Sequence, residues 1–311
     1  HVPSRAQLGC RIFAAFAAVG DFNGDGKPDL AVANYSVVAI LLGKGDGTFQ
    51  AVVNHGAGLS PRSVAVGDFN GDGKPDLAVA NYSVVAILLG KGDGTFQAVV
   101  NHGAGLSPRS VAVGDFNGDG KLDLAVANYS SPNVSVLLGK GDGAFLPSVN
   151  YNTGPLPFSV AVGDFNGDGK PDLAVAHVKP SIVAMLLGNG DGTFQTAINA
   201  SAGLNPECVV VGDFNGDGKP DVAVANSDSA DVSVLLNKCV SARLDLAIVR
   251  SNTSVAVSWL LPSHGFVLES TANLRSTNWL PSVDLQTTNN SRLEVTVPLS
   301  QGERYFRLRK P

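Results

Sequence analysis

The sequence predicts an all-β protein. Short runs of Val, Ala and Leu alternate with Gly and Asp-Gly signals, and such punctuation at intervals of about 8–12 residues is typical of strands joined by tight turns. These apolar runs are too short for helices. Among 311 residues, 44% are hydrophobic and only 16% are charged, so a buried core is expected and charge-driven disorder is not.

One unit is repeated along the chain. Each copy contains an Asp-rich loop, and the loops begin at Asp21, Asp68, Asp115, Asp164 and Asp213. The spacings are therefore 47, 47, 49 and 49 residues. Residues 18–74 and 65–121 are identical at a shift of 47, which indicates a recent duplication. A period of this size predicts a propeller, a solenoid or an array.

Each unit contains four segments of strand type. In the second copy they are "SVAVGDF" (63–69), "DLAVAN" (76–81), "VVAILLGK" (84–91) and "TFQAVVNHG" (95–103). Four antiparallel strands in 47–49 residues match the blade of a β-propeller. The first segment is rich in Ala, Val and Gly, as an inner strand near a crowded axis should be. We therefore predict a β-propeller of about five four-stranded blades over residues 12–240.

The composition changes after Cys239. The Asp loops stop, and segments such as "SVAVSWLLP" and "RLEVTVPL" alternate apolar and polar residues. This pattern predicts a small antiparallel β-sandwich over residues 241–311. Its predicted core comprises Trp259, Phe266, Leu268, Val295, Val297 and Phe306.

The Asp loop has the pattern D-x-N-x-D-G-x-x-D, which predicts a cation site. Oxygen ligands at positions 1, 3 and 5 converge on one ion, a carbonyl at position 7 and a carboxylate at position 9 complete the shell, and Gly at position 6 permits the sharp turn. Without a metal, the clustered carboxylates would repel and raise each other's pKa. Ca²⁺ suits this set of hard oxygens better than Mg²⁺, which demands stricter geometry. We predict about five Ca²⁺ ions, one per repeat.

The predicted ligands follow the same five positions in every copy, with the lysine acting through its carbonyl. They are Asp21, Asn23, Asp25, Lys27, Asp29, Asp68, Asn70, Asp72, Lys74, Asp76, Asp115, Asn117, Asp119, Lys121, Asp123, Asp164, Asn166, Asp168, Lys170, Asp172, Asp213, Asn215, Asp217, Lys219 and Asp221. The aspartates account for 15 of the 27 acidic residues, and five Ca²⁺ ions would turn the formal charge from −5 to +5. The acidity therefore indicates metal ligation.

Two other structures share part of this loop pattern. An EF-hand or dockerin loop begins in the same way, but an EF-hand needs Glu at position 12, where this chain has Val32, and a strand pattern follows here in place of a helix. An Asx-rich turn without a metal is the second alternative. Five copies of the full donor set at fixed spacing favour the metal site.

The segment "VAVGDFNGDGKPDLAVAN…VAILLGKGDGTFQ" resembles the FG-GAP/VCBS repeat family, which is also seen in integrin α-subunit propellers. The resemblance implies a Ca²⁺-binding β-propeller, usually extracellular, in adhesion, glycan-binding or surface proteins. Such propellers commonly have seven blades, so the five copies here form either a five-bladed ring or part of a larger one. The last copy lacks the "GDGTFQ" strand, which "CRIFAAFAAV" near the N-terminus could supply; that segment could equally be just the first inner strand. The C-terminal region faintly resembles a fibronectin type III-like module.

Strand order predicts two different faces. The Asp loops and the "GDG" hairpin turns lie on one face, and the "NYS" and "HGAGLSP" loops lie on the other. The second face carries the candidate ligand-binding residues Tyr35, Tyr82 and Tyr129, together with His55 and His102. Aromatic and amide side chains suit stacking on sugars, so we predict a recognition surface there. The alternative is that these side chains only pack the loops.

The sequence argues against several classes of function. No catalytic arrangement of His, Ser or Cys stands out, no basic cluster suggests a nucleic-acid partner, and no apolar run approaches the roughly 20 residues of a membrane span. Cys10 and Cys239 flank the repeats and could form a disulfide. The N-terminus is interpreted as a mature or truncated start.

The preferred prediction is a secreted or cell-surface binding and adhesion module, not an enzyme, with structural Ca²⁺ and a glycan or a surface protein as partner. The sequence leaves its oligomeric state open. One alternative is a structural or assembly protein of the cell surface. The other is a carbohydrate-active enzyme such as a polysaccharide lyase, because some of these enzymes use the same propeller.

Overall fold

The computed structural model describes residues 16–34 and 36–238, and beyond them seven strand segments, at 247–250, 254–260, 267–271, 280–281, 286–289, 292–298 and 305–309. The chain divides into two compact units, His1–Cys239 and Val240–Pro311. All regular structure in the described residues is β-strand, which confirms the all-β prediction for them. No helix in this part of the chain is long and apolar enough to cross a membrane.

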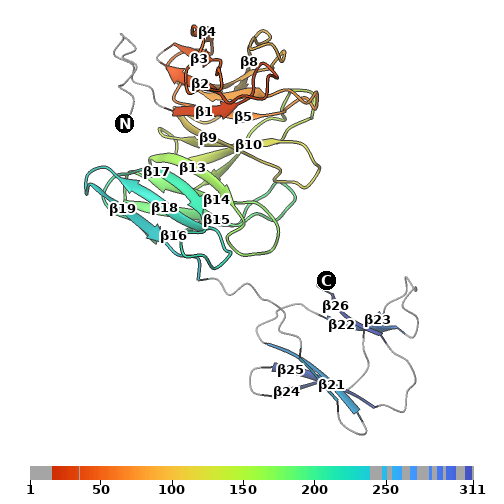
Figure 1. Ribbon diagram of the computed structural model, residues 1–311. Helices are drawn as coiled ribbons and strands as arrows, with labels where there is room; N and C mark the ends of the chain where they lie inside the picture. The colour runs from red at the N-terminus through yellow and green to blue at the C-terminus, as the bar shows by residue number, and fades with distance from the viewer. Residues whose placement is uncertain are drawn as a thin grey trace. The chain divides into compact units, whose positions relative to one another are not determined.

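The first unit is a row of five antiparallel sheets, coloured from red to teal in Figure 1. The first sheet holds β1 (Phe16–Gly20), β2 (Asp29–Asn34), β3 (Val37–Leu41) and β4 (Val53–Gly56); the second holds β5 (Ser63–Gly67), β6 (Asp76–Ala80), β7 (Val84–Leu88) and β8 (Val100–Gly103); the third holds β9 (Pro108–Gly114), β10 (Asp123–Asn128), β11 (Asn133–Leu137) and β12 (Val149–Asn152); the fourth holds β13 (Pro157–Gly163), β14 (Asp172–His177), β15 (Ile182–Leu186) and β16 (Ile198–Ser201); the fifth holds β17 (Pro206–Gly212), β18 (Asp221–Asn226) and β19 (Asp231–Leu235). Strands follow chain order within each sheet.

These sheets are consistent with the blades of a propeller. Four of them have the predicted four strands, and the fifth has three within the described residues. The first strands of successive sheets lie side by side, from β1 through β5, β9 and β13 to β17. Serine side chains link these inner strands, since the backbone amides of Val111, Val160 and Val209 donate to the Oγ atoms of Ser63, Ser110 and Ser159, each at 3.2 Å. The first and fifth sheets lie at opposite ends of the row, so the described residues do not close a ring (Figure 1).

Apolar side chains fill the spaces between successive sheets. Because side chains alternate between the two faces of a strand, each inner sheet contributes one set to the preceding interface and another to the following one. In the second sheet, Leu77 and Val79 pack towards the first sheet, whereas Ala78 and Ile87 pack towards the third. The strands β6, β10 and β14 are buried throughout as a result.

The second unit contains two further antiparallel sheets. One is formed by β20 (Ala247–Arg250), β21 (Ser254–Leu260), β25 (Arg292–Pro298) and β24 (Gln286–Asn289), and the other by β23 (Leu280–Pro281), β22 (Val267–Thr271) and β26 (Tyr305–Arg309). Val295 is buried, as predicted. The side chains of the other predicted core residues lie outside what the structure describes, so the sandwich core stays a prediction.

One glycine in each of the first four sheets is required by close packing. A Cβ atom on Gly90 would lie 2.2 Å from the carbonyl oxygen of Pro75. We expect Gly90→Ala to destabilise the unit by roughly 1–3 kcal/mol, because the backbone must shift to relieve the overlap. Gly103→Ala is the matched control, since a Cβ atom there meets nothing within 4 Å. Urea denaturation of both variants checks this, and equal effects would contradict it.

Candidate functional site

Each Asp loop connects the first and second strands of its sheet and is shaped by its first aspartate. In the first loop, Asp21 Oδ1 accepts hydrogen bonds from the amides of Gly24 (2.8 Å) and Asp25 (3.1 Å), and Asp21 Oδ2 accepts one from Gly26 (2.8 Å). Gly24 and Gly26 have φ of +72° and +78°, a backbone region that favours glycine. The four later loops repeat this arrangement.

The aspartate at position 9 is buried under its loop. Asp29 Oδ2 accepts the amide of Phe22 at 2.8 Å, and Asp29 Oδ1 accepts the amide of Gly43 at 2.7 Å. Gly43 begins the turn that follows the third strand, so one carboxylate ties both turns of the loop face together. Burial raises the pKa of the equivalent Asp76, and the charges of Asp72 and Asp68 raise it further.

The remaining side chains of the loop make shorter-range contacts. Asn23 Oδ1 accepts the amide of Asp25 at 3.0 Å, and Asp25 Oδ1 accepts the amide of Lys27 at 3.0 Å. The Lys27 ammonium also lies 3.3 Å from Asp25 Oδ2. This contact and the backbone hydrogen bond of Lys27 lower the pKa of the Asp25 carboxyl, the backbone bond most. Position 5 is thus an exposed carboxylate beside a lysine of its own loop.

The donor chemistry of the loops fits a hard cation. A carboxylate oxygen has about two acceptor sites, and each oxygen of the buried Asp29 accepts one backbone amide, so the Asp29 carboxylate has acceptor capacity beyond these two hydrogen bonds. The carboxylates are nonetheless not gathered: among the described residues, no three His, Cys, Asp or Glu side chains are close enough together to hold a metal ion. Calcium binding therefore stays a prediction, as does the alternative of an Asx-rich turn.

Two of the three tyrosines predicted for the face opposite the Asp loops lie within the described residues. Tyr82 is exposed, and its amide donates to the carbonyl of Leu59 at 2.9 Å. Tyr129 is half-buried, with its ring against Phe158 and the Arg109 guanidinium 5.4 Å from its centroid. Tyr35 lies outside the described residues, as do Cys10 and Cys239 and the segment 12–15.

The placement of His55 and His102 on the recognition face was wrong. The His55 ring packs edge-on against Phe96, with centroids 5.1 Å apart, and His102 packs in the same way against Phe145 at 5.3 Å. Both histidines lie in the outermost strands of their sheets. Sequence alone did not show which face of these strands each side chain occupies.

In the second, third and fourth sheets, the Phe of the Gly-Asp-Gly-x-Phe segment fills a slot against the preceding sheet. Phe96 of the second sheet also contacts Phe22 of the first, with centroids 5.9 Å apart, and the amide of Gly94 donates to the carbonyl of Phe22 at 2.9 Å. The next two slots pair Phe145 with Phe69 and His102, and Phe194 with Phe116 and Tyr151. The sequence predicted a Gly-Asp-Gly hairpin turn and a following strand here but no packing role for the Phe, although its recurrence at the same offset in four copies was a signal for one.

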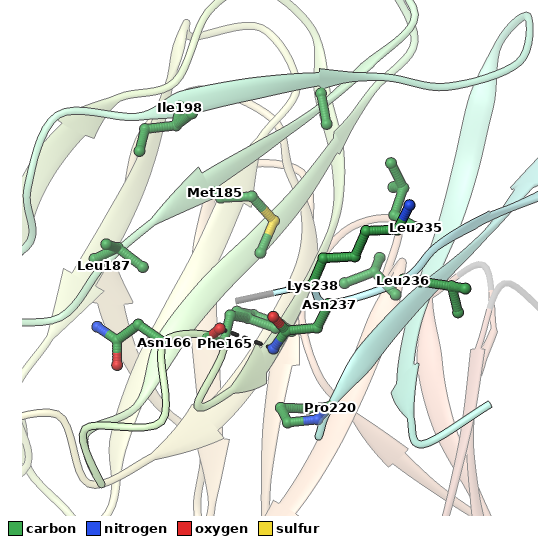
Figure 2. A pocket seen from close by; sticks show the side chains of 12 residues that line it. Phe165, Asn166, Met185, Leu187, Ile198, Pro220, Leu235, Leu236, Asn237 and Lys238 are labelled. Carbon is green, nitrogen blue, oxygen red and sulfur yellow. Dashed lines mark hydrogen bonds between the residues drawn. The ribbon is translucent and has the colours of Figure 1, made fainter. Parts of the chain in front are cut away.

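The slot between the fourth and fifth sheets is a cavity of about 320 Å³ (Figure 2). Phe165, Leu187 and Ala200 line it from the fourth sheet, and the fifth repeat has no Gly-Asp-Gly-x-Phe segment. Asn237 Nδ2 donates to the carbonyl of Phe165 at 2.8 Å, as the dashed line in Figure 2 marks. That bond replaces the one that Gly94 makes in the first slot. The change in sequence thus opens an apolar pocket while keeping the buried carbonyl satisfied.

Comparison with known families identifies the repeats. The model of the FG-GAP-like repeat matches residues 21–79, 68–126, 115–175 and 178–224, which together span more than half of the chain. The chain belongs to the FG-GAP-like repeat family. The FG-GAP part of the predicted resemblance is therefore confirmed, whereas the VCBS and fibronectin type III-like parts stay predictions. Together the four matches extend from the Asp loop of the first sheet to β18 of the fifth sheet.

Solved structures share the propeller-like fold of this FG-GAP-like chain. A lectin from Agrocybe aegerita that recognises non-reducing terminal N-acetylglucosamine is 15% identical, with 94% of this chain and 84% of that chain covered and a TM-score of 0.51. A functionally unknown protein from Desulfotomaculum acetoxidans is 14% identical, with 82% and 81% covered and the same TM-score. At such identities the likeness shows the fold alone. No curated protein matches the chain in sequence.

We expect His177 to make the stability of the FG-GAP-like unit depend on pH. It stands where four other repeats have Asn, and it is fully buried with Nδ1 2.8 Å from the carbonyl oxygen of Pro155. Burial lowers its pKa below the ordinary 6.5. The unfolded chain therefore binds the proton first as pH falls, and the free energy of unfolding should decrease between pH 7.5 and pH 5.5.

The variant His177→Asn should show a smaller decrease. Asn can replace the hydrogen bond, as Asn81 Nδ2 does by donating to the carbonyl of Ala57 at 2.8 Å. Urea midpoints at the two pH values measure the difference. An unchanged pH dependence in the variant would show that His177 does not titrate in this range.

Proposed function

We propose that the chain is a calcium-stabilised binding module that acts outside the cell and recognises a glycan or a surface protein. The observation that carries the binding role is a row of exposed apolar side chains on the face opposite the Asp loops. Leu59, Tyr82, Leu106 and Leu204 are all exposed there, and we name these four residues the apolar row. The three leucines occupy equivalent positions in loops that join successive sheets, so they would offer a ligand the same apolar contact in three repeats.

The backbone holds the apolar row in place. Ser130 donates its amide to the carbonyl of Leu106 at 3.1 Å, and Asp228 donates to the carbonyl of Leu204 at 3.2 Å, so each leucine loop is tied to the loop between the second and third strands of the following sheet. Ser60 and Ser107, which directly follow Leu59 and Leu106 in the chain, have φ of +53° and +58°. Such conformations cost energy outside glycine and persist where the surroundings fix them.

Calcium would serve the same module from the opposite face. The side chains at positions 1, 3, 5 and 9 and the carbonyl at position 7 are the groups that would hold it. Bound Ca²⁺ would add positive charge beside the carboxylates of each loop and, by binding only the folded chain, would favour the folded state.

A glycan array run with the labelled full chain, with and without Ca²⁺, tests the proposal. A glycan is the first ligand class to screen because one structural neighbour is a lectin. For any glycan found, Tyr82→Ala should weaken binding by about tenfold or more, since the stacking of a sugar ring on the aromatic ring is lost. The matched control is Leu146→Ala, an exposed apolar residue outside the apolar row. Equal binding by Tyr82→Ala and the control would contradict recognition through this row.

A further inference from the structure

Two sheet faces, one at each end of the row, are not covered by another sheet of the described residues, as the interior faces are. We name the first the N-terminal end face and the second the C-terminal end face. The N-terminal end face consists of Ala17, Val19, Leu30, Val32 and Phe49. The C-terminal end face consists of Val210, Phe214, Val232, Val234 and Leu236.

The duplicated sequence provides an internal control for the N-terminal end face. The first and second sheets have the same residues at almost every position, yet β2 alternates between buried and half-buried residues whereas β6 is buried throughout. Val19 is 62% exposed, but its counterpart Val66 packs against the first sheet. Since the side chains are identical, the difference comes from the preceding sheet that only the second one has.

The C-terminal end face shows the same contrast from the other side. Phe165 of the fourth sheet is 5% exposed because the fifth sheet covers it, whereas its counterpart Phe214 is 51% exposed. Val183 is fully buried, and its counterpart Val232 is 63% exposed. The C-terminal end face therefore has the same apolar composition as the faces buried between sheets, but no further sheet of the described residues covers it.

The two end faces are complementary because they are the two kinds of face that pack together between neighbouring sheets of the row. Within the row, the face that carries Phe69 or Phe165 is always covered by the face that carries the valines and leucines of the next sheet. The C-terminal end face is of the first kind, and the N-terminal end face is of the second. The first and fifth sheets, which carry these faces, lie at opposite ends of the row (Figure 1), so one copy does not bring them together in this arrangement.

We propose that the C-terminal end face of one copy binds the N-terminal end face of a second copy, continuing the row of sheets from chain to chain. The new contact would repeat the packing already present four times within the chain, including the approach of Phe49 to Phe214 as Phe96 approaches Phe22. Such a contact is heterologous, so each added copy leaves one free face of each kind. The proposal depends on the row of sheets alone and not on calcium or a glycan.

Two charge substitutions separate the faces experimentally. Val19→Lys blocks only the N-terminal end face, and Val234→Lys blocks only the C-terminal end face; both positions are exposed in the single chain, so the fold should be retained. Molar mass is measured by light scattering after size exclusion, at about 1–100 µM full-length chain, with and without Ca²⁺. Val149→Lys is the matched control, an exposed strand valine of the third sheet.

The wild type and Val149→Lys should rise above the monomer mass of 31.9 kDa as concentration increases. Each end-face variant alone should remain a monomer, and an equimolar mixture of the two should form a dimer that grows no further, because one variant retains each face. A monomeric wild type at 100 µM would overturn the proposal, as would association of Val19→Lys alone. A monomeric wild type whose melting temperature falls in both end-face variants would show that the faces join within one chain.

Discussion

Calcium should raise the melting temperature of the repeat unit by about 15–25 °C. A ligand that binds only the folded state contributes RT ln(1 + [L]/Kd), which is about 1.4 kcal/mol per loop at a free concentration ten times Kd. Five loops would together contribute about 7 kcal/mol, and each kcal/mol is worth about 2–4 °C for a unit of this size. Calcium modules outside cells have Kd of roughly 10⁻⁴–10⁻³ M, so 10 mM Ca²⁺ suffices. Differential scanning calorimetry in Ca²⁺ and in chelator measures the shift.

Two controls make this result specific. Mg²⁺ at the same concentration should give a much smaller shift, because it needs near-octahedral geometry and releases its waters reluctantly. The variant Asp72→Ala removes one exposed donor from one loop and should lose about one fifth of the calcium-dependent shift. Equal melting temperatures in Ca²⁺ and chelator would instead support Asx-rich turns that need no ion.

The sequence predicted most of the fold because the repeat is strict. Gly and Asp-Gly punctuation located the strands, and the 47–49-residue period located the sheets. It did not predict the open row or the uncovered end faces, since whether Val19 is buried depends on a neighbouring sheet and not on its own sequence. His55 was misplaced for a similar reason: a short outer strand exposes both faces, and only the packing of Phe96 shows which one the ring occupies.

The aspartate at position 9 illustrates what local pattern leaves out. The spacing within one nine-residue loop predicted that Asp29 is a metal ligand. The structure adds an acceptor role towards Gly43, which lies 14 residues away in the chain and is brought near by the sheet. Through this second contact the aspartate at position 9 stabilises the sheet, whereas the aspartate at position 5 bonds only within its own loop. The two positions should therefore respond differently to substitution.

Asp123→Ala is therefore expected to destabilise the unit even when no calcium is present. Asp123 is fully buried and accepts hydrogen bonds from the amides of Phe116 (2.8 Å) and Gly139 (2.7 Å). Removing the carboxylate leaves both buried donors without this acceptor, at a cost of about 1–3 kcal/mol each and so roughly 2–6 kcal/mol together. Urea denaturation in chelator measures the loss.

Asp119→Ala is the matched control from the same loop. Its carboxylate is exposed and accepts the amide of Lys121 at 3.0 Å. We expect it to leave stability in chelator unchanged within error and to reduce only the gain caused by Ca²⁺. Asp123→Asn should fall between the two in chelator, because its amide retains one oxygen acceptor. If Asp123→Ala were harmless in chelator, position 9 would act only as an ion ligand, and the hydrogen bonds to Phe116 and Gly139 would contribute nothing to the stability of the sheet.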